Sequence, residues 1–323
     1  FIMAANSWMQ HPVGYKMNAK GEPTLDNVGA LFTNPTFLWG YVHVILASLV
    51  TGALVMLAVS AWQIRKQREA EGFRHTARLS LVVLLPSIVL ALFVGSELGV
   101  IEARYQPMKI AAAEAQWKTC KPCSFSLFQI GGGKNDHTPS QIIEIPHVLS
   151  LLATNSWDGE VKGLGPLQKE YERKYGPGEY VPNVFLQYWS MRIMAYIAAA
   201  VLLFTLWGAW LLHRGTLERS KWFLRLGVWA VVTPFLMNTA GWMLTENGRQ
   251  PWIVQGLMKT VKANSPSVSA GEVWASLIGF VLIFAALGAA DVYLMLRYAR
   301  KGLPVEEPQP ARTLPPSTPV LTY

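Results

Sequence analysis

Apolar residues gather in five runs, each long enough to cross a membrane as a helix, at 37–64, 79–103, 187–212, 222–245 and 273–296. Spanning a hydrocarbon core about 30 Å thick takes roughly 20 apolar residues in a helix. Pro86 and Pro234 fall inside the second and fourth runs, where they predict kinks. The composition agrees, because only 15% of residues are charged, against roughly 25% in soluble domains. The pattern therefore predicts an all-α polytopic membrane protein.

Residues 1–9 are apolar but too short to cross a membrane, and no basic stretch precedes the run as it would in a signal peptide. We expect this segment to be the end of a truncated transmembrane helix. The predicted fold is then a helix bundle with about five complete transmembrane helices plus the end of one more. A missing N-terminal part would complete it.

Basic residues alternate between the links that join the runs. Eleven lie in 65–78, in 213–221 and just after the last run, whereas the links 10–36 and 246–272 hold five. By the positive-inside rule, the first set is cytoplasmic and the second faces outside. The net charge of +8 then reflects topology and gives no reason to expect nucleic acid as a partner.

This topology places the large segment 104–186 outside, as an extracytoplasmic loop with enough apolar residues to fold at least partly on the membrane surface. The tail 297–323 is cytoplasmic, and its prolines predict disorder. Cys120 and Cys123 stand in the outer loop without the following histidine of a c-type haem site or the second ligand pair of a zinc site. A structural disulfide is favoured, and a redox-active pair is the alternative.

Two runs that enter from outside carry possible metal ligands at similar depth. His43 and Met194 lie six and seven residues into their runs, about 10 Å below the outer surface. An imidazole and a thioether at one level could bind a haem iron from opposite faces, with Arg192 pairing with a propionate. Packing is the commoner role of a single histidine or methionine in a helix, so both interpretations stay open.

Two carboxylates lie in the same outer third. Glu97 falls about six residues below the outer end of 79–103, where its charge requires a partner or a proton. Glu246 closes the run 222–245 and directly precedes Asn247-Gly248-Arg249-Gln250-Pro251-Trp252. A solvated helix end is the alternative for Glu246. One polar site near the outer face would account for all these residues.

At Glu246–Trp252 the sequence resembles subunit I of cytochrome bd, the quinol oxidase of bacterial respiratory membranes. Further segments agree in the family's order: 5–14, 42–53, 95–99, 109–115 and 192–194. The resemblance covers nearly the whole chain up to the last run, and the GRQPW motif is its most specific part. The short outer loop matches the short-loop type, although Cys120-Lys121-Pro122-Cys123 is not a family feature.

The resemblance implies a role for each matching residue. His43 and Met194 match the axial ligands of a low-spin haem b, beside Arg192. Glu246 matches the carboxylate of a high-spin haem b, so it is a metal-ligand and catalytic candidate together with Glu97. The remaining matches are Trp242 and Arg249 as cofactor-binding residues, and Lys109 and Glu114 as quinol-binding residues.

The resemblance further implies haem d as the oxygen-reducing centre and cytochrome bd subunit II as partner, with possible small accessory subunits and membrane lipid. Quinol would be oxidised outside the bacterial inner membrane, and oxygen reduced to water with protons from the cytoplasm. Asn238 and Asp291 are weak candidates for that proton route. The family's first helices, which carry another axial histidine, are absent here, so this chain alone would not build the complete oxygen site.

Two other functions stay open from the residues. One is a haem b anchor that passes electrons between quinone and a dehydrogenase without oxygen chemistry. The other is a haem-free transporter in which Glu97 and Asp291 bind a proton or an ion. Neither function explains why the GRQPW motif occurs together with the other matching segments in the family's order.

Overall fold

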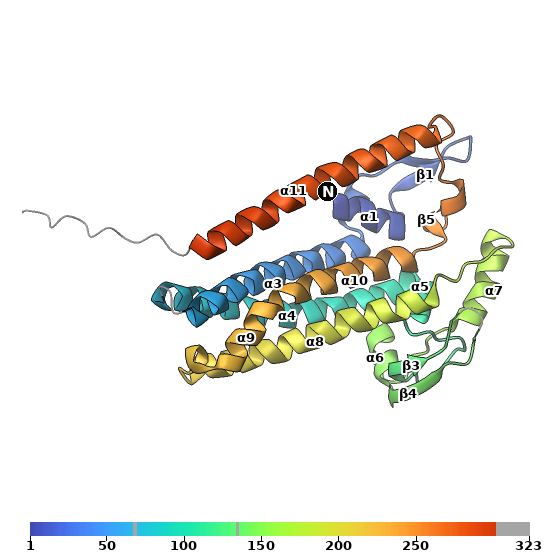
Figure 1. Ribbon diagram of the computed structural model, residues 1–323. Helices are drawn as coiled ribbons and strands as arrows, with labels where there is room; N and C mark the ends of the chain where they lie inside the picture. The colour runs from blue at the N-terminus through green and yellow to red at the C-terminus, as the bar shows by residue number, and fades with distance from the viewer. Residues whose placement is uncertain (67–69, 134–135, 302–323) are drawn as a thin grey trace, which may run out of the picture.

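The computed structural model describes residues 1–66, 70–133 and 136–301. Its main body is a set of long helices lying side by side (Figure 1). Five helical segments are long and apolar enough to cross a membrane, as the sequence predicts. They are α3 (Pro35–Arg65), α4 (Ala70–Tyr105), α8 (Val184–His213), the pair α9 (Lys221–Trp229) and α10 (Thr233–Gly248), and α11 (Ala270–Lys301).

The two prolines have different effects. Helix α4 continues through Pro86. At Pro234 the fourth segment changes course, because the 3-10 turn η2 (Ala230–Val232) separates α9 from α10 and the proline occupies the first turn of α10. Proline is favourable there, since the first turn has no intrahelical partner for its missing N–H group.

The core lies where α3, α4, α8 and α9 meet. Its buried side chains include Leu54, Leu57, Leu84, Ile88, Val201 and Phe223. Gly208 of α8 permits the closest approach, because a Cβ atom there would lie 2.7 Å from the Phe223 ring and 2.8 Å from Leu81. Small residues let membrane helices pack closely in this way.

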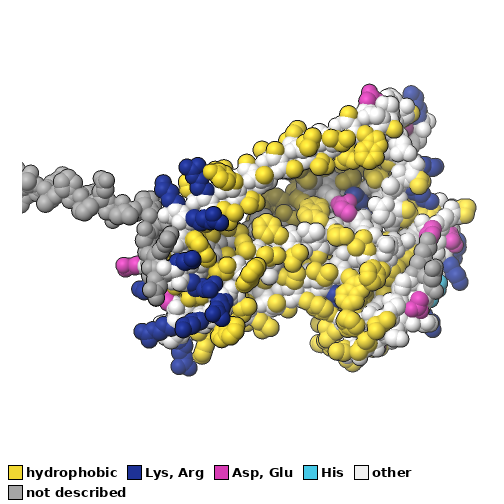
Figure 2. All heavy atoms as spheres, viewed as in Figure 1, with side chains coloured by type: hydrophobic (Ala, Val, Ile, Leu, Met, Phe, Trp, Pro, Cys, Tyr) yellow, Lys and Arg dark blue, Asp and Glu magenta, His cyan; other side chains and the backbone are white. Residues whose placement is uncertain are grey.

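Helix α11 stands apart from this core (Figure 1). None of its residues is buried, and its hydrogen bond to the bundle runs from Gln63 Nε2 to the Ala299 carbonyl at 2.5 Å. In the space-filling view the surface is hollowed between α11 and the rest of the molecule (Figure 2). Residues 297–301 are helical, so the predicted tail 297–323 begins too early, while 302–323 lie outside the described residues.

Lys and Arg side chains gather at the end of the bundle where α3, α8 and α11 end (Figure 2). This end includes the link between α8 and α9, which contains the 3-10 turn η1 (Leu217–Arg219). Arg74 pairs there with Glu218 at 2.6 Å. The charge segregation on which the topology prediction rests is therefore a feature of the folded molecule.

The segments at the opposite end contain regular structure, including short strands. The N-terminal part has α1 (Ile2–Gln10), β1 (Tyr15–Met17), β2 (Pro23–Leu25) and α2 (Gly29–Phe32), and the segment after α10 has β5 (Trp252–Val254), β6 (Met258–Lys259) and η3 (Thr260–Lys262). Segment 104–186 forms α5 (Pro107–Ala113), β3 (Phe125–Ile130), β4 (Ser140–Ile145), α6 (Val148–Thr154) and α7 (Leu164–Tyr175). The strands pair as antiparallel hairpins β1–β2, β3–β4 and β5–β6, which the all-α prediction does not include.

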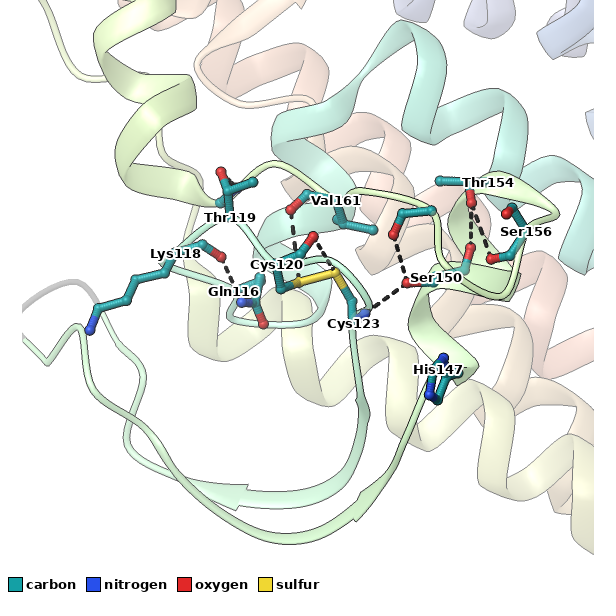
Figure 3. The surroundings of a disulfide bond; sticks show 12 residues. Gln116, Lys118, Thr119, Cys120, Cys123, His147, Ser150, Thr154, Ser156 and Val161 are labelled. Atoms are coloured by element: carbon teal, nitrogen blue, oxygen red, sulfur yellow. Dashed lines mark hydrogen bonds between the residues drawn. A yellow bond between two sulfur atoms is a disulfide. The ribbon is translucent and has the colours of Figure 1, made fainter.

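A second core lies where segment 104–186 meets α8 and β5, and in it Leu164 and Leu167 of α7 pack with Tyr180, Tyr188 and Trp252. Cys120 and Cys123 form the predicted disulfide, with Cα atoms 5.2 Å apart. The Cys123 N–H group donates to Ser150 Oγ at 2.7 Å, so the disulfide turn is tied to α6 (Figure 3). The segment is thus a folded layer over the outer end of the bundle.

Gly208→Val is expected to destabilise the bundle, because the added side chain would overlap Phe223 and Leu81. Overpacking of this kind costs about 1–3 kcal/mol. Gly279→Val in α11 is the matched control, since a Cβ atom there has no neighbour within 4 Å. Thermal unfolding in detergent measures both, and equal melting temperatures would contradict the close packing at Gly208.

Candidate functional site

His43 of α3 faces α4 at the position where that helix has a glycine. A Cβ atom on Gly95 would lie 3.1 Å from His43 Cε1, so any larger residue would press on the imidazole. His43 Nδ1 is buried without a hydrogen bond of ordinary geometry among the described residues, although the ring faces the Ala91 backbone. A buried polar nitrogen without a firm partner is costly, which fits a side chain that binds a further group.

Met194 of α8 also lies against a glycine. A Cβ atom on Gly241 of α10 would lie 3.2 Å from the Met194 sulfur, and the side chain borders the main core. Helices α3 and α8 begin at Pro35 and Val184, so His43 and Met194 are eight and ten residues from their helix starts. The two side chains therefore lie at similar depths below the outer ends of their helices. They have different neighbours, Gly95 for His43 and Gly241 for Met194. Ligation of one iron by both residues stays a prediction.

Arg192 is completely buried and all three of its side-chain nitrogens donate hydrogen bonds to protein. Two of them hold Glu114 at 3.0 and 2.6 Å, and Nε and Nη2 donate to the Ser126 carbonyl at 3.2 and 2.6 Å. The guanidinium also lies over the Tyr188 ring, 3.8 Å from its centroid. The predicted contact with a propionate stays a prediction, and the partner that the structure gives to Arg192 is Glu114.

Glu114, one of the two predicted quinol-binding residues, is 3% exposed and follows α5 directly. Burial raises the pKa of the Glu114 carboxyl, and the bidentate guanidinium opposes that rise. This pair joins the folded outer layer to the start of α8.

Lys109, the other predicted quinol-binding residue, has different partners. Its ammonium group contacts Glu102 Oε2 at 2.7 Å and Gln10 Oε1 at 2.6 Å. Burial lowers the pKa of Lys109, while the Glu102 carboxylate opposes the change. The sequence analysis missed Glu102, although it is an ionisable residue inside the run 79–103, which is the signal that singled out Glu97.

Glu246 lies in the last turn of α10, which extends to Gly248, rather than at the helix end. Its Oε1 atom accepts from Asn6 Nδ2 at 2.8 Å, and its Oε2 atom pairs with Arg249 Nη2. Arg249 is 6% exposed, and its Nε and Nη1 atoms are buried with no hydrogen-bond partner among the described residues. Two free cationic donors beside a carboxylate are suited to an acidic group from a bound molecule.

One side of α10 lines an open cavity of about 430 Å³. Asn238, Trp242 and Glu246 recur on it at a spacing of four residues, which places them on one helix face. Asn238 also donates to Thr51 Oγ1 of α3 at 3.2 Å. The cavity lining consists of Phe235, Asn238, Thr239, Trp242, Met243 and Glu246.

A second cavity, of about 180 Å³, lies between the outer layer and the start of α8. Most of its walls are apolar or aromatic, and Ala115 at its edge adjoins Glu114. Gln129 contributes a buried Oε1 atom that has no hydrogen-bond partner in the described part of the chain. The lining residues are Ala115, Phe128, Gln129, Ile130, Gly131, Val184, Phe185, Tyr188 and Trp189.

Glu97 is half-buried and accepts hydrogen bonds from Asn155 Nδ2 at 3.3 and 3.4 Å. Asn155 follows α6, so the outer layer reaches down to this carboxylate. The loop thus supplies this carboxylate with the polar partner that its position in the run requires, and its catalytic role stays a prediction. Asp291 is exposed on α11.

The donor set suits haem better than a bare metal ion. In the described residues, no three His, Cys, Asp or Glu side chains gather into a group that could hold a metal ion. Haem requires only axial protein ligands, since the porphyrin supplies the other nitrogens. The unsatisfied His43 and Arg249 nitrogens fit an iron ligand and a propionate partner respectively.

Comparison with known proteins identifies the family. The model of the family described as cytochrome bd terminal oxidase subunit I matches residues 1–303. The chain belongs to this family. Members of the cytochrome bd terminal oxidase subunit I family are, as the name says, cytochromes and thus haem proteins.

The similar proteins include cytochrome bd ubiquinol oxidase subunit 1 of Bacillus subtilis, which is 40% identical over 94% of this chain and 64% of its own length. Cytochrome bd-II ubiquinol oxidase subunit 1 of Escherichia coli is 28% identical over 94% of this chain and 70% of its own. The solved bd oxidase of Geobacillus thermodenitrificans matches with a TM-score of 0.79 and 27% identity, covering 94% of this chain and 66% of that one. The chain thus spans about two thirds of the length of these relatives.

Arg192→Met is expected to destabilise the fold strongly, because it leaves the buried Glu114 carboxylate without its counter-charge. Removing one partner of a buried ion pair costs about 3–5 kcal/mol. The double variant Arg192→Met with Glu114→Leu should regain most of that loss, since no uncompensated charge remains.

Thermal unfolding in detergent tests this prediction. Lys162→Met, in the exposed pair with Glu170, is the control and should cost no more than about 1 kcal/mol. A double variant as unstable as Arg192→Met alone would show that the loss has another cause.

Proposed function

We propose that this chain is a haem-carrying part of a cytochrome bd-type quinol oxidase, which oxidises quinol at the outer face and reduces oxygen to water. The observation that carries the proposal is the family match over residues 1–303, because this range contains every candidate ligand and quinol-site residue. The assembled enzyme would contain a low-spin haem b, a high-spin haem b and haem d. Subunit II, the rest of subunit I and small accessory subunits would complete it.

His43 and Met194 would hold the low-spin haem. Bound haem supplies one-electron chemistry between quinol, which loses two electrons, and oxygen. The protein contributes half-buried side chains on two helices, each lying against a glycine. Seating of this kind fixes ligand orientation, which is one way in which a protein tunes a metal centre.

Glu246 would hold the high-spin haem at the open cavity along α10, with Trp242 on the same wall. The two free nitrogens of Arg249 would donate to a propionate carboxylate and so satisfy a cation that is otherwise only partly paired. This assignment gives the GRQPW motif a physical role, since its arginine, which pairs with Glu246, would also bind the propionate of the haem.

Quinol would bind at the smaller cavity beside Glu114. Aromatic walls suit the flat ring of a quinol, and the free Gln129 Oε1 atom suits its hydroxyl group as an acceptor. Glu114, which adjoins the cavity-lining Ala115, would help release the two quinol protons to the outer side. Protons consumed in making water would enter from the end rich in Lys and Arg, so the reaction would separate charge across the membrane without a pump.

A reduced-minus-oxidised absorption spectrum of the purified native complex tests the proposal. We expect low-spin haem b signals and a long-wavelength haem d band in the wild type, with loss of the low-spin signal in both His43→Ala and Met194→Ala. Met108→Ala, in the outer layer, is the control and should retain the low-spin signal.

A wild-type complex without haem absorbance would contradict the proposal. Low-spin haem without a high-spin or d-type signal would instead favour the haem b anchor.

A further inference from the structure

A continuous chain of hydrogen bonds joins the candidate quinol-site lysine to the candidate haem carboxylate. Lys109 Nζ donates to Gln10 Oε1 at 2.6 Å, and Gln10 Nε2 donates to Asn6 Oδ1 at 2.7 Å. Asn6 Nδ2 then donates to Glu246 Oε1 at 2.8 Å. Glu102 closes the outer end by pairing with Lys109 at 2.7 Å.

The direction of this chain is fixed by its two charged ends. An ammonium group is a donor only, so Gln10 must present its oxygen to Lys109 and its amide nitrogen to Asn6. Asn6 must therefore accept with its oxygen and donate with its nitrogen. An ionised carboxylate is an acceptor only, so Glu246 completes the sequence without any mismatched group.

The members come from four separate elements, and all of them except Glu246, whose side chain is 42% exposed, are shielded from water. Asn6 and Gln10 lie one turn apart on α1 and are 7% and 5% exposed, and Lys109 on α5 is 3% exposed. Glu102 on α4 is 9% exposed. Hydrogen bonds strengthen one another in such a low-dielectric setting, because each polarises the next.

We propose that Gln10 and Asn6 are positioning residues that couple the Lys109–Glu102 charge pair to Glu246. The inference rests on the proposed function, in which Glu246 is an iron ligand, and on the prediction from the family resemblance that Lys109 binds quinol. The two amides transmit polarisation and orientation between these sites. Glu102 is the fixed counter-charge that anchors the outer end of the chain.

The expected effect follows from what a donor does to a ligand carboxylate. The N–H group of Asn6, polarised by the Lys109 ammonium through Gln10, withdraws electron density from Glu246. Loss of this donor makes Glu246 a stronger electron donor, which stabilises the oxidised iron. Breaking the chain should therefore lower the midpoint potential of the haem at Glu246.

Optically monitored redox titration of the purified complex measures this potential. For Gln10→Met we expect a threefold to tenfold shift toward oxidised haem at a fixed potential, where tenfold equals about 59 mV for one electron. Gln106→Met is the matched control. Gln106 is an equally buried amide that donates to the Gln10 carbonyl at 2.8 Å but lies outside the chain, so the potential should stay within the titration error of the wild type.

A thermodynamic cycle with Lys109→Met shows whether Gln10→Met changes the potential by cutting the link to Lys109 or only by disturbing the local structure. If Gln10 carries the influence of Lys109, Gln10→Met should change the potential little once Lys109 is already Met. Asn6→Asp, nearly the same size, replaces the donor facing Glu246 by an acceptor and should also lower the potential. The Asn6→Asp variant tests the hydrogen-bond chain to Glu246 in case the Gln10→Met complex fails to assemble.

The outcomes separate this inference from the proposed function. A wild-type complex without haem would overturn both. A complex with the expected haems, in which Gln10→Met and Gln106→Met have equal potentials and Asn6→Asp equals the wild type, would overturn the coupling alone. Additive effects of Gln10→Met and Lys109→Met would also overturn it.

Discussion

Burying a cation without a partner is so costly that it governs how the outer end of this bundle is arranged. Arg192 and Lys109 lie 0% and 3% exposed, and each brings a different segment of chain into place. Arg192 binds Glu114 and the Ser126 carbonyl, which ties the outer layer to α8. Lys109 binds Glu102 and Gln10, which ties α5 to α4 and α1.

The two cations also divide the outer end into two neighbouring regions. Beside the Arg192–Glu114 pair lies the smaller, aromatic cavity, in which Tyr188 is shared between the cavity wall and the guanidinium. Beyond Lys109, the amide chain leads to Glu246 and the open cavity along α10. A site for a flat quinol ring and a site for a haem would thus be held by the same polar framework.

Much of this could be predicted from the sequence. The five membrane segments follow from long apolar runs, and the Lys- and Arg-rich end follows from the positive-inside rule. The folding of 104–186 was harder to predict, because its short hairpins depend on packing between distant residues such as Leu164 and Trp252. The partners of Lys109 and Arg192 could not be predicted either, since Gln10 and Glu114 lie 99 and 78 residues away in the chain.

An experimental density map of the purified native complex tests the central claim most directly. The claim is that buried charge pairs hold the outer end of the bundle in the geometry that binds haem. The account predicts one iron between His43 and Met194, a second at Glu246, and intact contacts of Arg192 with Glu114 and of Lys109 with Glu102. Haem irons ligated by other residues, or Arg192 and Lys109 exposed to solvent, would contradict it.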